Sequence, residues 1–262
     1  MSECARAKVN LSLHITGKRP NGYHELDSIV VFPQVGDVLT PGGKGLRISG
    51  PFGAGLSTHE NLVQKAAALL GVPPDIHLEK NLPVASGIGG GSADAAATLR
   101  LLAKGAVPDG LSLGADVPAC IVSKPLRMRG IGEQIALLPK LPDFAVVLAN
   151  SGEPVSTAAI FAALARVDNA AGVAVPKGLN TPEFFAFVAT QRNDMQPAAV
   201  QIFPSIAKVL TALKCVPSCA VSRMSGSGGT CFGLFESLIE AEKAAAEIKR
   251  AHPDWWVVAA KG

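Results

Sequence analysis

Apolar and polar residues alternate along the N-terminal segment of the chain. Every odd position from 5 to 15 is apolar, and the even positions carry Arg6, Lys8, Asn10, Ser12 and His14. A period of two is typical of a half-buried strand, with one face in the core and the other toward solvent. Asn21-Gly22 is a strong hairpin signal. A second strand is therefore predicted over 26–32, with Tyr23 and His24 at the mouth of the hairpin.

The middle of the chain predicts a strand, a glycine-rich loop and a helix in succession. Apolar residues at helical spacing predict a helix over 61–70, and Gly71 is suited to follow its end. Alternation predicts a strand over 76–80. The glycine-rich stretch that follows runs into an Ala/Leu-rich helix predicted over 92–104.

The pattern changes after Pro142. Strands are predicted over 144–150, 219–224, 230–235 and 255–260, and helices over 157–165, 182–190, 204–213 and 238–250. When adjacent helices are merged, the order is β-α-β-β-α-β, which is ferredoxin-like. The sequence thus predicts an α+β protein of two domains, 1–142 and 143–262.

Composition and charge exclude several classes of protein. The 48% hydrophobic content of the 262 residues is that of a globular protein, not of a disordered one. The net charge is only +3 and the basic residues are scattered, so no nucleic-acid partner is expected. No apolar run approaches the ~20 residues of a membrane span, and no targeting segment precedes the first strand. We therefore expect a cytoplasmic protein with no membrane partner, acting as a monomer or a homodimer.

The five cysteines fit a reducing compartment better than a disulfide framework. Cys215 and Cys219 are four residues apart, but no second Cys or His pair lies near them in the sequence. A zinc site is the weaker interpretation, and buried thiols are the better one.

The glycine-rich loop is the main candidate for chemistry. Glycines allow backbone N–H groups to approach a bulky anion, and a helix start adds free N–H donors and a positive dipole end. Ser92 is suited to cap the helix, or to bind a metal ion or a phosphate oxygen. The loop is neither a P-loop nor a dinucleotide fingerprint. The alternative is a tight structural turn.

Three further segments carry candidate polar groups. The first is the strand face of Lys8, Asn10 and Ser12, whose alternative is a solvated edge strand. The second contains Asp116, a carboxylate between apolar neighbours of the kind that accepts a hydroxyl proton in phosphoryl transfer. A helix cap or turn aspartate is the alternative there. The third is the Gly/Ser-rich segment 224–230, which is suited to close over phosphates from the opposite side or to form a flexible hairpin turn.

Together these four segments resemble the GHMP kinase family, named for galactokinase and for homoserine, mevalonate and phosphomevalonate kinases. Its signature is a proline, three variable residues and a glycine-rich run with serine. The matching residues here are Pro83, Val84, Ala85, Ser86, Gly87, Ile88, Gly89, Gly90, Gly91 and Ser92. Segments 7–24, 113–118 and 130–133 are most similar to the family member whose substrate is a cytidine diphosphate-linked methylerythritol.

The resemblance implies a ribosomal-protein-S5-like N-terminal domain, a ferredoxin-like C-terminal domain and an active site in the cleft between them. ATP would be the phosphate donor, with Mg²⁺ bridging its phosphates and Ser92 as a metal ligand. Asp116 would act as the base with Lys8 assisting. The implied binding residues are Pro83 to Ser92 for the triphosphate, Asn61 and Lys80 near the adenine and ribose, and Asn10, Tyr23 and His24 for the substrate.

Other functions on the same fold remain open at this point. A homoserine or mevalonate kinase would share the loop, a sugar- and ATP-binding sensor would need no base, and a mevalonate diphosphate decarboxylase would release carbon dioxide. Only residues 105–112 separate the loop helix from the Asp116 segment, which is shorter than the family pattern. We still expect Asp116 to reach the cleft.

Overall fold

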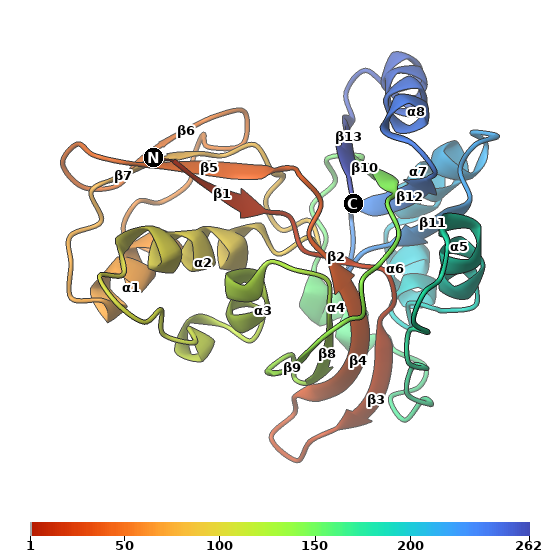
Figure 1. The fold of residues 1–262 in the computed structure, drawn as a ribbon, viewed down its shortest axis with the longest axis horizontal. Coiled ribbons are helices and arrows are strands. Elements are labelled where there is room, and N and C mark those ends of the chain that lie inside the picture. Colours follow the sequence, from red (N-terminus) through yellow and green to blue (C-terminus); the bar gives the residue numbers. More distant parts are fainter. Residues whose placement is uncertain (1) are drawn as a thin grey trace.

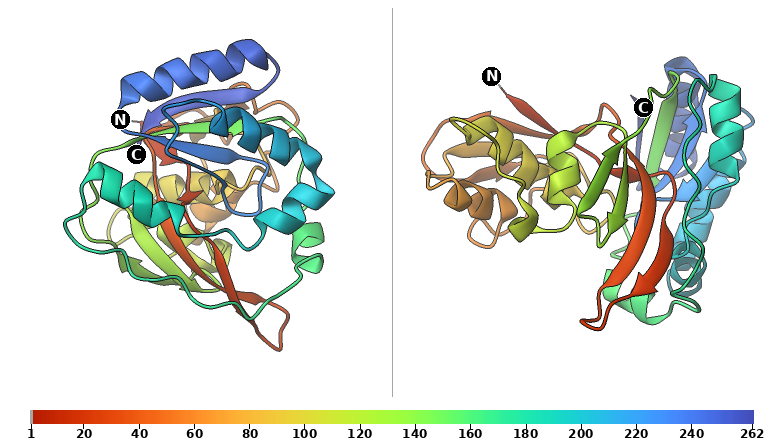
Figure 2. Two further views of the ribbon diagram at one scale, coloured as in Figure 1. Left: turned by 90° about the vertical axis from the view of Figure 1, so that its right-hand side faces the viewer. Right: turned by 60° about the horizontal axis from the view of Figure 1, so that its bottom comes forward.

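The computed structural model describes residues 2–262 and has two lobes (Figure 1). The N-terminal half of the chain forms the left lobe in that view, and the C-terminal half forms most of the right one. A long hairpin of the N-terminal half curves along the C-terminal half, which is clearest in the right-hand view of Figure 2. The two halves therefore meet over an extended surface.

The left lobe is a four-stranded sheet covered by helices. The strand order is β1-β5-β7-β6, and α2 packs against α1, α3 and β1. Asn61 caps α1, because its Oδ1 accepts a hydrogen bond from Val63 N at 2.9 Å. The elements are β1 (Glu3–Arg6), β5 (Gly36–Pro41), β6 (Arg47–Ser49), β7 (Ile76–Glu79), α1 (Leu62–Leu69), α2 (Gly90–Leu102), the short 3-10 helix η1 (Leu111–Leu113) and α3 (Val117–Val122).

A second sheet joins the two lobes. Its order is β2-β4-β8-β9, and β3 also pairs with β4 to make the predicted hairpin. Leu13 forms a bridge with Asn193, so the hairpin is fixed to the C-terminal half. The elements are β2 (Val9–Asn10), β3 (His14–Lys18), β4 (His24–Val31), β8 (Leu126–Gly130) and β9 (Gln134–Leu137).

The C-terminal sheet has the order β11-β12-β10-β13 with antiparallel neighbours. This arrangement confirms the ferredoxin-like order and the α+β class predicted from the sequence. The boundary at 142/143 stays a prediction. The elements are β10 (Ala145–Asn150), β11 (Val221–Met224), β12 (Cys231–Phe235), β13 (Trp256–Lys261), α4 (Thr157–Ala162), α5 (Thr181–Ala189), α6 (Gln196–Ile202), α7 (Pro204–Lys214) and α8 (Leu238–Ala251).

The apolar face of the N-terminal segment is divided among three cores. Ala5 lies in the core of the left lobe, Leu13 and Ile15 lie under α6 to α8, and the residues between them pack on the other face of the C-terminal sheet. The expected half-buried strand is wrong in two respects. The segment breaks into β1, β2 and β3, and its polar positions 8 to 14 are buried too, because the glycine-rich loop and the C-terminal half cover them.

Some local predictions also need correction. Helix α2 begins at Gly90, not at Ser92, and α3, α6, β5, β8 and β9 were not predicted. Cys215 is exposed and Cys219 is half-buried, so the prediction of two buried thiols is wrong for this pair. In the part of the chain that the structure describes, no helix is long and apolar enough to cross a membrane.

Candidate active site

Two pockets lie on either side of the glycine-rich loop, and Ser92 lines both. One has a volume of about 330 Å³ and is bounded by the loop, the start of α1 and Lys80. The other has a volume of about 290 Å³ and is bounded by Lys8, Asn10 and Asp116 together with residues of the C-terminal half. Groups bound in the two pockets would therefore meet at the start of α2.

The glycine-rich loop is fixed from behind by the Gly/Ser-rich segment of the C-terminal half. Ser225 Oγ donates a hydrogen bond to Gly87 O at 3.1 Å, and Thr230 N donates one to Ser86 O at 3.0 Å. No residue of segment 224–230 lines the first pocket, and its closure over bound phosphates stays a prediction. Gly226 and Ser227 line the second pocket instead.

Lys8 and Asp116, which are 108 positions apart in the sequence, are close neighbours in the second pocket. Lys8 Nζ lies 3.2 Å from Asp116 Oδ1 and donates a hydrogen bond to Asn10 Oδ1 at 3.1 Å. Asn10 is held in turn by Ser28 Oγ, which accepts from its Nδ2 at 2.7 Å. The Lys8 side chain is 7% exposed and that of Asp116 is 37% exposed, so the carboxylate is the group open to a ligand.

Asp116 sits at the N-cap position of α3 but makes no capping hydrogen bond with its side chain. The helix-cap alternative is thus right about the position and wrong about the role. A carboxylate that leaves its own helix uncapped stays available for contact with another group.

The hairpin mouth contributes an aromatic pair at the margin of the second pocket. His24 stacks on Phe161 with ring centroids 4.6 Å apart, and Phe161 lines the pocket. Burial, and secondarily Lys18, lowers the pKa of His24, which favours the neutral ring. Tyr23 is 59% exposed beside it. Neither Tyr23 nor His24 lines the pocket itself.

The first pocket contains both residues predicted beside the nucleotide base. Asn61 lines it from the start of α1, although its Oδ1 is used as a helix cap. Lys80 lines it from the end of β7, but its ammonium group is already bonded to the carboxylates of Asp37 and Asp94.

No group of three His, Cys, Asp or Glu side chains within residues 2–262 is arranged to hold a metal ion. Mg²⁺ needs few protein ligands when substrate phosphates supply oxygens. The hydroxyl of Ser92 is an oxygen donor of the right kind and makes no capping bond, since Gly89 occupies the N-cap position of α2. The donor set therefore fits a phosphate-held Mg²⁺ and does not fit a metal caged by protein.

Several lining residues of the second pocket were not predicted. They come from eight separate elements or loops, and of these only the Gly/Ser-rich segment 224–230 was singled out as a candidate loop. They are Leu13, Leu26, Ala115, Met128, Ile131, Thr157, Phe161, Met195, Gly226 and Ser227. Thr157 Oγ1 and Ser227 Oγ are 2.7 Å apart and form a hydroxyl pair on the C-terminal side of this pocket.

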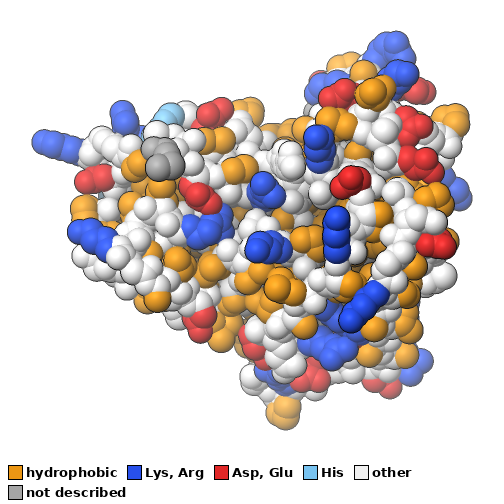
Figure 3. Space-filling model, in the orientation of Figure 1, with side chains coloured by type: hydrophobic (Ala, Val, Ile, Leu, Met, Phe, Trp, Pro, Cys, Tyr) orange, Lys and Arg blue, Asp and Glu red, His pale blue; other side chains and the backbone are white. Residues whose placement is uncertain are grey.

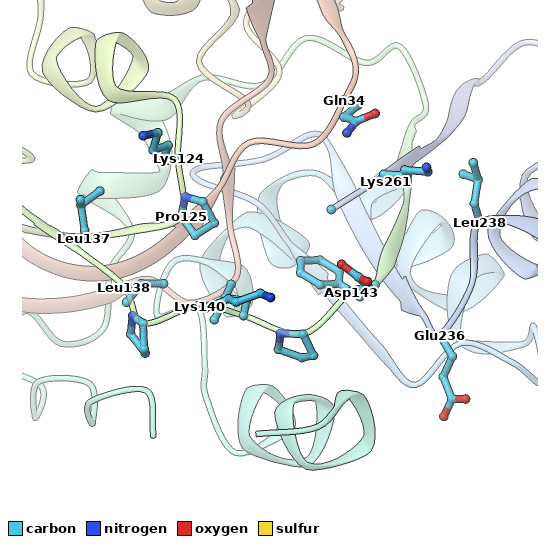
Figure 4. A pocket seen from close by; sticks show the side chains of 15 residues that line it. Gln34, Lys124, Pro125, Leu137, Leu138, Lys140, Asp143, Glu236, Leu238 and Lys261 are labelled. Atoms are coloured by element: carbon cyan, nitrogen blue, oxygen red, sulfur yellow. The ribbon is translucent and has the colours of Figure 1, made fainter. Parts of the chain in front are cut away.

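A larger pocket of about 570 Å³ lies away from all these groups, at the junction of the two lobes (Figure 4). Lys124, Lys140 and Lys261 line it among prolines and leucines. Figure 3 shows lysine and arginine side chains along this junction. None of the predicted site residues lines this pocket, so size alone does not mark the candidate active site.

Comparison with known proteins identifies the class of the chain. Residues 61–124 match the GHMP kinases N-terminal domain, and residues 186–254 match the GHMP kinases C-terminal region. The chain is 51% identical over 267 residues to a 4-diphosphocytidyl-2-C-methyl-D-erythritol kinase of Paracoccus denitrificans, covering 98% of this chain and 95% of the relative. A relative of the same name from Dinoroseobacter shibae is 51% identical over 97% of this chain and 92% of its own.

A solved structure of an enzyme with an equivalent name is similar to this chain in both fold and sequence. The crystal structure of a 4-(cytidine 5'-diphospho)-2C-methyl-D-erythritol kinase matches with a TM-score of 0.79 and 31% identity, covering all of both chains. With these similarities, the chain has the fold of a small-molecule kinase and is one. Within that class the chain belongs to the GHMP kinase family, as its signature loop predicted.

Proposed function

We propose that this kinase transfers the γ-phosphate of ATP to a hydroxyl of the methylerythritol part of 4-diphosphocytidyl-2-C-methyl-D-erythritol. The observation that carries the proposal is the pair of pockets that share Ser92, with Lys8 and Asp116 in one and the glycine-rich loop in the other. The acceptor is taken from relatives of that name that align with 97–98% of this chain. Such an activity belongs to the non-mevalonate isoprenoid precursor pathway.

ATP would lie in the first pocket. Its triphosphate would run along the loop from Pro83 to Ser92, where backbone N–H groups and the first turn of α2 face the pocket. Asn61 and Lys80 would flank the adenine and ribose. The γ-phosphate would then lie at Ser92, where the two pockets meet.

The chemistry follows from the Lys8–Asp116 pair. Asp116 would accept the proton of the acceptor hydroxyl. The oxygen of that hydroxyl would bond to the γ-phosphorus of ATP as the bond between this phosphorus and the ADP oxygen breaks. The Lys8 ammonium, 3.2 Å from Asp116 Oδ1, would stabilise the negative charge that develops on the acceptor oxygen. Asn10 would hold Lys8 in this position through its 3.1 Å hydrogen bond.

Mg²⁺ would be held by the phosphates and the Ser92 hydroxyl. When bound, it offsets the negative charge of the triphosphate. The protein groups around it do the remaining work of binding and orienting the acceptor.

The cytidine end of the acceptor would extend toward the hairpin mouth. His24 stacks on Phe161 there and Tyr23 is exposed next to His24 in the chain, and aromatic faces stack well on nucleobases. Asn10 would contact the methylerythritol part, because it lines the same pocket as Asp116.

The proposed activity is tested by the release of ADP. Purified protein with ATP and Mg²⁺ is expected to release ADP with 4-diphosphocytidyl-2-C-methyl-D-erythritol as acceptor, and not with homoserine or mevalonate. Turnover of homoserine or mevalonate instead would move the protein elsewhere in the family. ATP binding without turnover of any acceptor would indicate a sensor and contradict the proposal.

Replacing Gly87 by alanine is expected to weaken ATP binding. Gly87 has φ +74, and a Cβ there would lie 2.5 Å from Gly228 O and 2.6 Å from Ser225 O. Both oxygens belong to the backbone of the Gly/Ser-rich segment 224–230, so the glycine-rich loop and this segment must move apart. Isothermal titration with ATP is expected to show a loss of about tenfold or more, since a misplaced loop loses its preorganised N–H groups.

Gly178→Ala is the matched control for that prediction. Gly178 has φ +75, and no atom lies within 4 Å of a Cβ placed there. It therefore carries the same backbone strain, of order 1–3 kcal/mol, without the collision. Equal loss of ATP affinity in both variants would contradict the importance of the contact between the loops.

A further inference from the structure

A buried cluster of three charged residues lies beneath the glycine-rich loop. Lys80 Nζ donates hydrogen bonds to Asp37 Oδ2 and, at 2.7 Å, to Asp94 Oδ2. The side chains of Lys80, Asp37 and Asp94 are 5%, 0% and 4% exposed. Burying charged groups costs free energy unless each is paired and hydrogen-bonded. A buried cluster of this kind is therefore expected to have nearly all its hydrogen bonds made, or to serve a function that offsets the cost.

The cluster is connected to both ends of the loop. Asp37 Oδ1 accepts hydrogen bonds from Asn81 N at 2.6 Å and Leu82 N at 2.8 Å, the two residues directly before Pro83. Asp94 lies in the second turn of α2, directly after the loop. Lys80 links the two carboxylates and therefore ties the start of the loop to the helix at its end.

The ammonium group of Lys80 also lies close beneath the first turn of α2. A Cβ added to Gly90 would be 3.2 Å from Lys80 Nζ. The loop above it contains backbone conformations that are held by their surroundings, with φ of +50 at Ala85, +74 at Gly87 and +66 at Gly89. Such a loop keeps its shape only when its two ends are fixed.

Asp94 depends on Lys80 within this cluster. Its Oδ2 accepts a hydrogen bond from Lys80 Nζ, while its Oδ1 is buried and has no hydrogen-bond partner. Burial, only partly offset by Lys80, raises the pKa of Asp94 well above its ordinary range, while Asp94 and Asp37 together raise the pKa of Lys80 despite its burial. The hydrogen bond from Lys80 is therefore the contact that fixes Asp94.

We propose that Asp37, Lys80 and Asp94 are positioning residues that hold the glycine-rich loop in the shape that receives the nucleotide phosphates, an inference that rests on the proposed use of ATP. Asp37 fixes the start of the loop, Asp94 fixes the helix at its end, and Lys80 connects them. Asp37 does not line the first pocket, and Asp94, which does, is only 3% exposed, so both act mainly through the loop.

The test compares Asp94→Ala with Asp27→Ala, using the full-length protein. Both aspartates are 3% exposed, and both accept hydrogen bonds from a cationic side chain, Lys80 in one case and the partly buried Arg127 in the other. Asp27 joins β4 to Arg127 and Arg129 of β8, away from the loop. Each substitution thus removes a buried carboxyl group from a cationic partner, and only one of them is at the loop.

Isothermal titration with ATP and Mg²⁺, without acceptor, is the first readout, and thermal unfolding is the second. Asp94→Ala is expected to weaken ATP binding by about 10–100-fold, because displaced N–H groups no longer converge on the phosphates. Asp27→Ala is expected to lower the unfolding temperature similarly but to leave ATP affinity within about threefold. Equal weakening in both variants would overturn the proposal, since stability alone would then account for the loss.

Asp94→Asn is the second variant, for the case that Asp94→Ala does not fold, because its amide oxygen can still accept a hydrogen bond from Lys80. It is expected to bind ATP within about threefold of the unmodified protein, since the hydrogen bond that positions the helix is kept. A loss as large as that of Asp94→Ala would overturn the positioning role of this hydrogen bond. Because no acceptor is used, these binding results do not depend on which acceptor the kinase phosphorylates. If the unmodified protein binds no ATP, the proposed function itself is refuted.

Discussion

Asp116→Asn is expected to reduce kcat for phosphoryl transfer by about 10²–10⁴-fold, the range of a positioned general base. The amide keeps the size of the side chain but accepts no proton at neutral pH. Asp116 makes no capping bond with its side chain, so α3 should not be disturbed. The measurement is ADP release under saturating ATP and acceptor, with thermal unfolding in parallel.

The KM for ATP separates a catalytic role from a structural one. Asp116 lines the second pocket and not the nucleotide pocket, so ATP affinity should stay within about threefold. Asp254→Asn, at an exposed aspartate of the C-terminal half, is the control and should be silent in both assays. A fall in kcat of less than tenfold in Asp116→Asn would mean that another group accepts the proton.

Arg223→Met is expected to lower the free energy of unfolding by about 3–5 kcal/mol. The Arg223 guanidinium is buried and bonded to backbone carbonyls alone, at 2.7 Å from Leu11 O, 3.0 Å from Val188 O and 2.7 Å from Gln191 O. Burial lowers its pKa to about 10, so the group stays charged at neutral pH. The methionine fills the space but leaves these acceptors without donors.

The position of these carbonyls explains why the effect should be large. Val188 lies in the last turn of α5, where the helix dipole is negative, and Leu11 lies between β2 and β3 in the N-terminal half. Arg223 thus links the end of a helix to the segment that carries Lys8 and Asn10. Urea unfolding measures the loss, with Arg250→Met at an exposed position of α8 as the control, expected within about 0.5 kcal/mol. A small loss at Arg223 would mean that water or relaxation satisfies the carbonyls.

The sequence predicted most of the regular structure because local patterns dominate there. The Asn21-Gly22 turn and the strand-loop-helix around the glycines match the structure within a few residues, and the apolar positions from 5 to 15 are buried as expected. The ferredoxin-like order followed from counting strands and helices in the C-terminal half. Short elements such as α3 and β9 escaped prediction, because they contain too few residues to show a period.

The surroundings of the N-terminal strand escaped prediction for a different reason. A polar face of a strand predicts contact with solvent unless another part of the chain packs on it. No pattern in the neighbouring residues indicates that another segment does so. Lys8 N bonds to Ile88 O, and Asn10 N bonds to Ser225 Oγ, so the cover comes from segments about 80 and 215 positions away. Lys8, Asn10 and Ser12 therefore line or support a buried site instead of an exposed edge.

The sequence by itself determined most of the longer elements, the glycine-rich loop and the family, because these depend on side-chain period, on backbone freedom at glycine and on a signature of adjacent residues. Only the tertiary structure decided that Lys8 lies 3.2 Å from Asp116, that Phe161 stacks on His24, and that Lys80 is held between two carboxylates. Each of these contacts joins residues that no shared period or motif connects. Their proximity arises from packing free energy summed over the whole core, and no short segment of the chain contains that sum.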